Sequence, residues 1–129
     1  MFENVKIKIM KGYLFLEYPA CGTCRKTKKW LDEQKVDYTN RHIVEERPTR
    51  EELKIWFERS GLPLRKFFNT SGLLYKSMQL KEKLDGMSEE KQLELLASDG
   101  KLVKRPLVIG EDFVLVGFKP EEWEKVLLK

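Results

Sequence analysis

Cysteine, histidine and long apolar runs are scarce in this 129-residue chain, which has two cysteines and one histidine. Two cysteines are too few to staple a small secreted scaffold, and a reducing compartment would keep them mostly as thiols. No apolar run approaches the roughly 20 residues that a membrane-spanning helix needs. Residues 1–12 also lack the apolar segment and small-residue cleavage site of a secretory signal. We therefore expect a cytoplasmic protein that has no membrane partner.

The chain carries little excess charge, because 25 Lys and Arg oppose 21 Asp and Glu and leave a net charge of +4. The two signs alternate along most of the sequence, as on a solvated surface, so we expect no direct binding of nucleic acid. The densest basic cluster is Arg25, Lys26, Lys28 and Lys29. We interpret it as a positive potential that attracts anions or favours a thiolate.

Both cysteines lie in one stretch, Tyr18-Pro19-Ala20-Cys21-Gly22-Thr23-Cys24-Arg25-Lys26. An apolar run over 13–18 predicts a buried strand that ends at the proline. The amphipathic stretch from 22 to about 34 predicts a helix with Thr27, Trp30 and Leu31 on its inner face. This order places Cys21 at the mouth of a helix and Cys24 one turn inside it.

Further elements follow on both sides of a helical middle region. A strand over 36–43 completes a strand–helix–strand unit, whose two strands run parallel. Near the other end, residues 107–109 and 113–116 predict a β-hairpin, and a last helix from Pro120 is expected to turn Trp123, Val126 and Leu127 inward. Between these parts, capping and breaking residues predict helices over 50–60, 64–67, 73–78, 80–84 and 89–98.

The predicted fold is α/β and thioredoxin-like: a βαβ unit, a helical insertion and a ββα unit build a mixed four-stranded sheet flanked by helices. A Cys-x-x-Cys beside a βαβ unit is the sequence signal of this class. We assign residues 13–129 to one domain, because the central helices form an insertion and not a second core. Residues 1–12 form an N-terminal extension, whose alternation over 5–9 permits a short edge strand or a loose tail.

The cysteine pair is the candidate catalytic centre. The thiolate is the reactive form of cysteine, and a free thiol has a pKa of about 8.5. Cys21 meets the unpaired N–H groups of a helix N-terminus, and Arg25 with the following lysines adds positive potential. We predict that Cys21 is the nucleophile and that Cys24 is the resolving thiol that attacks the mixed disulfide. Two inert thiols in a structural turn remain the alternative.

A metal site is not expected from these residue types. Zinc takes about four ligands, and the soft donors of the chain are Cys21, Cys24 and His42. A structural disulfide between the two cysteines would close too short a loop to stabilise the fold much. His42 falls in the second predicted strand, where a satisfied or exposed side chain is a better interpretation than a catalytic base.

A second group of candidate residues is Val103-Lys104-Arg105-Pro106-Leu107. In a thioredoxin-like chain the proline before the third strand faces the cysteines, and its peptide bond is commonly cis. Arg105 would then lie near Cys21, where it could pair with a thiolate or a bound oxyanion. Arg65, in the segment 62–68, is the other candidate cation.

Four motifs together resemble the ArsC/Spx family of thioredoxin-fold, glutaredoxin-like proteins, over about residues 13–128. They are the cysteine stretch 18–26, Asn69-Thr70-Ser71-Gly72 followed by Tyr75-Lys76, the segment 104–109, and Val116-Gly117-Phe118. The resemblance implies one of two functions. Glutathione-dependent arsenate reductases of the family use a cysteine at the position of Cys21 and three arginines around the oxyanion. Spx-type regulators use the Cys-x-x-Cys as a redox switch and bind RNA polymerase.

The chain departs from the arsenate reductases at two places. Arg65 and Arg105 resemble two of the three arginines, but the segment of the third reads Val116-Gly117-Phe118-Lys119. Cys24 stands where those reductases commonly have serine. We therefore expect a thiol–disulfide oxidoreductase related to them, with a Spx-like, redox-switched regulator that binds RNA polymerase as the alternative.

The resemblance also implies which residues form the site. The expected catalytic residues are Cys21, Cys24 and Arg105. The expected substrate-binding residues are Gly22, Thr23, Arg65 and Pro106. We expect no bound cofactor, glutathione or thioredoxin as the reductant, and an oxyanion as one candidate substrate.

Overall fold

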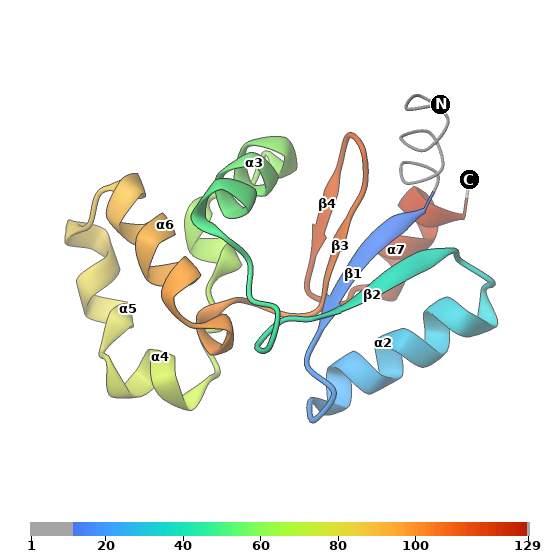
Figure 1. Ribbon diagram of the computed structural model, residues 1–129, viewed down its shortest axis with the longest axis horizontal. Helices are drawn as coiled ribbons and strands as arrows, with labels where there is room; N and C mark the ends of the chain where they lie inside the picture. Colours follow the sequence, from blue (N-terminus) through green and yellow to red (C-terminus); the bar gives the residue numbers. More distant parts are fainter. Residues whose placement is uncertain (1–11, 129) are drawn as a thin grey trace.

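The computed structural model describes residues 12–128 (Figure 1). The expected alternation over 5–9, and the extension 1–12 apart from its last residue, lie outside this range. Within the range, none of the helices has the length and apolar character to cross a membrane. The strands and α-helices are β1 (Tyr13–Glu17), α2 (Gly22–Glu33), β2 (Tyr38–His42), α3 (Arg50–Ser60), α4 (Leu73–Ser77), α5 (Leu80–Lys83), α6 (Glu89–Ser98), β3 (Leu107–Ile109), β4 (Val114–Val116) and α7 (Pro120–Leu127).

Single turns of 3₁₀ helix complete the middle region, at Leu64–Phe67, Leu84–Gly86 and Gly100–Leu102. The predicted order of elements is confirmed, and most boundaries differ from the predicted ones by no more than one residue. The second strand is shorter than predicted, because it begins at Tyr38 and not at residue 36. The hairpin strand β4 likewise begins one residue later than predicted.

The four strands form one mixed sheet in the order β2-β1-β3-β4. β1 and β2 run parallel and are joined by α2, as the strand–helix–strand unit predicted. β3 is antiparallel to both β1 and β4. β1 is therefore an inner strand. The cysteine loop follows its carboxyl end and so lies beside the central strands of the sheet.

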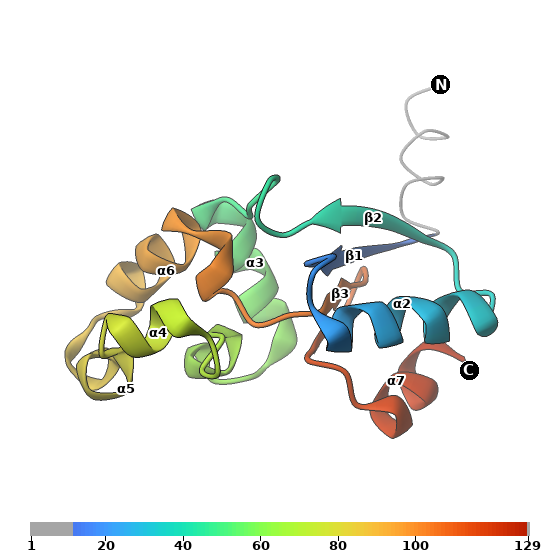
Figure 2. The same cartoon turned by 90° about the horizontal axis from the view of Figure 1, so that it is seen from below.

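Two separate cores cover the two faces of the sheet. On one face, Phe15, Val108 and Leu115 pack against Leu31 of α2 and Trp123 of α7. Figure 2 shows α2 and α7 on this same side of the sheet. On the other face, sheet residues such as Leu16 share a single core with the helical insertion from α3 to α6. The insertion thus shares a hydrophobic core with the sheet.

Capping residues determine where the helices of the insertion begin and end. Thr49 and Glu52 form the predicted capping box, and Gly61 ends α3 in the left-handed conformation at φ 69°. Ser88 accepts a hydrogen bond from the Lys91 N–H at the start of α6. One packing prediction is wrong: Val126 of α7 is 37% exposed. The helix has only eight residues, and its inward face is formed by Trp123 and the partly buried Leu127.

Candidate active site

Cys21 is the N-cap residue of α2, in an extended backbone conformation. Its N–H donates to the Tyr18 carbonyl at 2.8 Å, which closes the turn between β1 and the helix. No side chain among the described residues caps this helix end, and its first turn carries no acidic residue. The N–H groups of the first turn are therefore left to face the Cys21 sulfur, an arrangement that favours a thiolate.

The two thiols of the pair have opposite environments. Cys21 is partly exposed, and Cys24 is fully buried. Partial burial opposes ionisation of Cys21, but hydrogen bonds from Cys24, Arg105 and the Thr23 N–H outweigh it and lower its pKa below that of an ordinary cysteine. Burial raises the pKa of Cys24 to about 12, and the neighbouring Cys21 thiolate adds to the increase. Cys21 is thus the ionisable thiol and Cys24 the protonated one.

Arg105 is held beside the cysteines by an aromatic ring. Its guanidinium carbon lies 4.8 Å from the centre of the Tyr18 ring, a cation–π arrangement. One guanidinium nitrogen, Nη1, is buried and has no hydrogen-bond partner among residues 12–128. A buried donor without a partner is costly, so this nitrogen is available for an anionic or carbonyl oxygen of a ligand.

The Arg105–Pro106 peptide bond is cis, as predicted. Pro106 is buried at the start of β3, and its carbonyl accepts a hydrogen bond from the Gly117 N–H at 2.9 Å. Gly22 and Thr23 are exposed in the first turn of α2. Thr23 and Arg105 both influence Cys21, and the roles of Gly22, Thr23 and Pro106 in binding a substrate stay predictions.

Arg65 lies apart from this group. It is exposed in the 3₁₀ turn Leu64–Phe67, and its guanidinium forms an ion pair with Asp85. Arg65 does not line the cavity beside Arg105. Its role in oxyanion binding stays a prediction, and it would require the guanidinium to leave Asp85.

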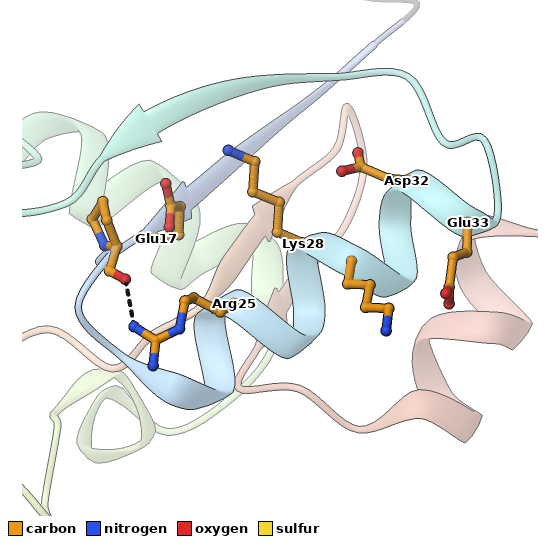
Figure 3. A pocket seen from close by; sticks show the side chains of 7 residues that line it. Glu17, Arg25, Lys28, Asp32 and Glu33 are labelled. Atoms are coloured by element: carbon orange, nitrogen blue, oxygen red, sulfur yellow. Dashed lines mark hydrogen bonds between the residues drawn. The ribbon is translucent and has the colours of Figure 1, made fainter.

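Arg25, one residue of the basic cluster behind the cysteines, has a structural contact, and the effect of the cluster on anions or on a thiolate stays a prediction. The Arg25 guanidinium donates to the Pro19 carbonyl at 3.1 Å and so stabilises the cysteine loop (Figure 3). Arg25 and Lys28 line a groove of about 720 Å³ together with acidic residues, among them Glu17 and Asp32. This groove is mixed in charge and not a uniformly positive surface.

Glu17 and Tyr18 are site neighbours that the sequence did not single out. Glu17 is 4% exposed, and its carboxylate accepts a hydrogen bond from the Asn40 amide at 2.9 Å. Its position in a predicted buried strand of apolar residues could have indicated it, because a charged residue that is buried there needs a polar partner. Tyr18 has no such signal, since its contact with Arg105 joins segments that are distant in the sequence.

His42 is satisfied structurally, as expected. Its Nδ1 accepts hydrogen bonds from the N–H groups of Val44 and Glu45, at 3.2 and 3.0 Å. These bonds hold the turn after β2. Within residues 12–128, no group of three or more His, Cys, Asp or Glu side chains is arranged to hold a metal ion.

The relatives found by sequence comparison include an uncharacterised protein and transcriptional or other regulatory proteins. The uncharacterised protein YusI of Bacillus subtilis is 57% identical over 111 residues, which cover 86% of this chain and 94% of that protein. The regulatory protein MgsR of B. subtilis is 33% identical over 115 residues, or 89% of this chain and 90% of that protein. The global transcriptional regulator Spx 2 of Bacillus anthracis is 27% identical over 108 residues, or 84% of this chain and 81% of that protein.

Solved structures similar to this chain include a protein described as related to the ArsC family and one described as a possible arsenate reductase. A protein related to the ArsC family from Bacteroides fragilis has a TM-score of 0.87 and 64% identity, and covers 92% of this chain and 98% of its own. A structure described as a possible arsenate reductase from Streptococcus mutans has a TM-score of 0.80 and 42% identity, with 87% of this chain and 97% of its own covered. These likenesses confirm the thioredoxin-like fold. The sequence model of the ArsC family matches residues 16–126, and the chain belongs to the ArsC family.

Proposed function

We propose that this protein is a cytoplasmic thiol–disulfide oxidoreductase in which Cys21 is the nucleophile and Cys24 the resolving thiol. The observation that carries the proposal is the opposite displacement of the two pKa values: that of Cys21 is lowered, and that of Cys24 is raised to about 12. Such a pair has one thiol ready to attack and one that stays protonated until it is needed. Two inert thiols in a structural turn would have no need of this asymmetry.

The proposed reaction is a thiol–disulfide exchange in two steps. The Cys21 thiolate attacks one sulfur of a substrate disulfide, forms a mixed disulfide and releases the other sulfur as a thiolate, which takes a proton. Cys24 then loses its proton and attacks the Cys21 sulfur, which releases the second substrate thiolate. The substrate gains two electrons, and Cys21 and Cys24 end as a disulfide.

The second step is helped by the loss of the Cys21 charge. Burial is the largest cause of the raised pKa of Cys24. The hydrogen bond between Cys24 and the Cys21 thiolate, and the negative charge of that thiolate, raise it further. Both disappear once Cys21 is bound in a disulfide, so Cys24 ionises more readily at that stage. Glutathione or thioredoxin, as a thiol reductant, would return the pair to its reduced form.

Arsenate is a candidate oxyanion substrate of the same site. The support is the unpartnered Nη1 of Arg105, whose side chain also helps to lower the pKa of Cys21, and the family of the chain. An arsenate oxygen could accept from this nitrogen while the Cys21 thiolate attacks the arsenic and displaces one arsenate hydroxyl, which takes a proton and leaves as water. The absence of the third family arginine from segment 116–119 makes organic disulfides the better candidates.

The test is the pH dependence of Cys21 alkylation, together with disulfide turnover. Iodoacetamide should modify Cys21 with a pKa below that of a free cysteine, and the protein should reduce hydroxyethyl disulfide in the presence of glutathione or thioredoxin. Cys21→Ser should abolish this turnover. A Cys21 pKa at or above the free value, or turnover that survives Cys21→Ser, would refute the proposal.

A redox-switched regulator remains the second candidate function. The similarity to MgsR over 89% of the chain favours it, and RNA polymerase would be the partner, as the resemblance to Spx-type regulators implies. The experiment is a pull-down with RNA polymerase, using the reduced and the oxidised protein. Binding that changes with oxidation would support this candidate, and binding of neither form would count against it.

A further inference from the structure

A cavity of about 580 Å³ opens beside Arg105, between the cysteine loop and the helical insertion. Tyr18 and Arg105 form its wall on the side of the cysteines. The opposite wall comes from the turn before α4 and from α4 itself, and includes Asn69, Ser71 and Leu73. A cavity of this size is typical of sites for organic ligands, and an inorganic oxyanion on Arg105 would leave most of it empty.

The wall on the insertion side is held firmly in place. The Asn69 N–H donates to the Leu102 carbonyl at 2.8 Å, and the Gly72 N–H returns to the Asn69 carbonyl at 3.1 Å. A Cβ on Gly72 would approach the Asn69 side-chain amide to 2.7 Å and the Asn69 carbonyl oxygen to 3.3 Å, so the turn is closely packed. The next residue, Leu73, is therefore presented by a fixed turn.

Leu73 is 86% exposed, although it lines the cavity. An exposed leucine alone indicates nothing. On the wall of a cavity that also contains an unpartnered guanidinium nitrogen, it offers an apolar contact to whatever reaches Arg105. Arsenate has no apolar group for this contact, and glutathione has no apolar side chain. The contact suits a polypeptide with an apolar residue beside its reactive cysteine.

The other side chains of the cavity suit a peptide as well. The Asn69 amide and the Ser71 and Ser77 hydroxyls can bond to peptide groups. Two cations, Lys101 and Arg105, face one acid, Asp99, whose carboxylate already accepts from the Lys101 N–H. This balance leaves a small positive excess, and it does not select a strongly charged ligand.

We propose that the cavity between Arg105 and Leu73 binds the polypeptide segment around a target cysteine, so that the substrate of the pair is a peptidyl disulfide. The proposal rests on the proposed oxidoreductase function. Cys21 attacks the peptidyl sulfur, and the displaced thiolate takes a proton. Attack by Cys24 then frees the peptide thiol and leaves the Cys21–Cys24 disulfide, so two electrons pass from the protein to the substrate.

The experiment compares two disulfides under single-turnover conditions, which need no added reductant. The fully reduced protein is mixed with the symmetrical disulfide of a blocked pentapeptide, whose cysteine is flanked by leucines, or with hydroxyethyl disulfide. The peptide disulfide should react about tenfold faster. Leu73→Ser should lower this selectivity ratio about five- to tenfold, because the lost contact is one leucine side chain against an apolar ligand.

Two variants serve as controls. Leu62→Ser changes another exposed leucine, 37% exposed and outside the cavity, and should keep the ratio of the unmodified protein. Leu73→Met, which keeps an apolar side chain, should retain most of the ratio. A ratio near one, a ratio that Leu73→Ser leaves intact, or equal rates for oxidised glutathione and the peptide would overturn the proposal while the oxidoreductase function stands. Failure to react with either disulfide would remove both.

Discussion

The guanidinium of Arg105 lies over the ring of Tyr18, with 4.8 Å between the guanidinium carbon and the ring centre. The two residues come from the end of β1 and the start of β3, and the contact fixes the arginine beside the Cys21 sulfur. Arg105 is one of the groups that lower the pKa of Cys21. The ring of Tyr18 thus acts on the Cys21 thiol through Arg105.

Replacing Tyr18 should weaken Cys21 as a nucleophile. Tyr18→Leu removes the ring that holds Arg105, so the pKa of Cys21 should rise towards its ordinary value. Since a cation–π contact at a partly exposed site contributes about 0.5–1 kcal/mol, alkylation of Cys21 at pH 6.5 should slow about two- to fivefold. Tyr18→Phe keeps the ring and should alkylate at nearly the unmodified rate. Equal rates for Tyr18→Leu and Tyr18→Phe would contradict the positioning role.

Replacing Cys24 should stop the reaction at the mixed disulfide. In Cys24→Ser, Cys21 can still attack a disulfide, but no second thiol can release the product. Intact-protein mass spectrometry after addition of hydroxyethyl disulfide should show a stable mercaptoethanol adduct on the variant. The unmodified protein should show only the internal disulfide, two mass units lighter than the reduced form. Rapid loss of the adduct from the variant would mean that Cys24 is not the resolving thiol.

Arg41 and Glu52 should make the stability of the fold depend on pH. Arg41 forms a two-pronged ion pair with Glu52, with both N–O distances at 2.9 Å. The hydrogen bonds from Arg41 hold the pKa of Glu52 below its ordinary value of 4.5. The stabilisation is therefore complete above about pH 4.5 and is lost as the pH falls through the lower, folded-state pKa.

Glu52→Gln should accordingly lower the free energy of unfolding by about 1 kcal/mol at pH 7, measured by urea denaturation. The difference from the unmodified protein should shrink as the pH falls below about 4 and towards the folded-state pKa of Glu52, because the carboxylate is protonated first in the unfolded state and then in the folded state. Glu58→Gln, at an exposed position of the same helix, should have little effect at either pH. A difference that stays constant down to pH 3 would show that the charge of Glu52 is not involved.

Gly100 should not tolerate a side chain. It is buried where the turn after α6 meets the end of β2, and an added Cβ would overlap the Ile43 carbonyl oxygen and come within 2.8 Å of the Val44 Cα. Because both obstacles are backbone atoms, Gly100→Ala should destabilise the fold by about 2–3 kcal/mol. At Gly86 an added Cβ meets no described atom within 4 Å, so Gly86→Ala should unfold near the unmodified temperature. Equal melting temperatures for the two variants would contradict this packing.

Much of the fold could be predicted from local signals. The periodicity of residues 13–43, the capping box at Thr49 and the hairpin pattern around Gly110 each depend on neighbours close in the sequence, so those elements formed as predicted. The prediction that Val126 is buried was wrong, because helical periodicity defines the inward face of a helix but not how far the sheet extends beneath that face. The second strand was predicted too long for a similar reason, since pairing with β1 begins only at Tyr38.

The sequence by itself determined the cysteine pair and its place at a helix mouth, because those follow from residue types and spacing, and likeness to thioredoxin-like chains made Arg105 and Pro106 candidates. Only the tertiary structure showed which cation lies where it can lower the pKa of Cys21. Packing directs Arg25 to the Pro19 carbonyl and Arg65 to Asp85, and it places the guanidinium of Arg105 over the Tyr18 ring and near Cys21. Contacts of this kind join segments that are far apart in the chain, so no local pattern records them. The same holds for the cavity beside Leu73, whose two walls meet only when the insertion packs against the sheet.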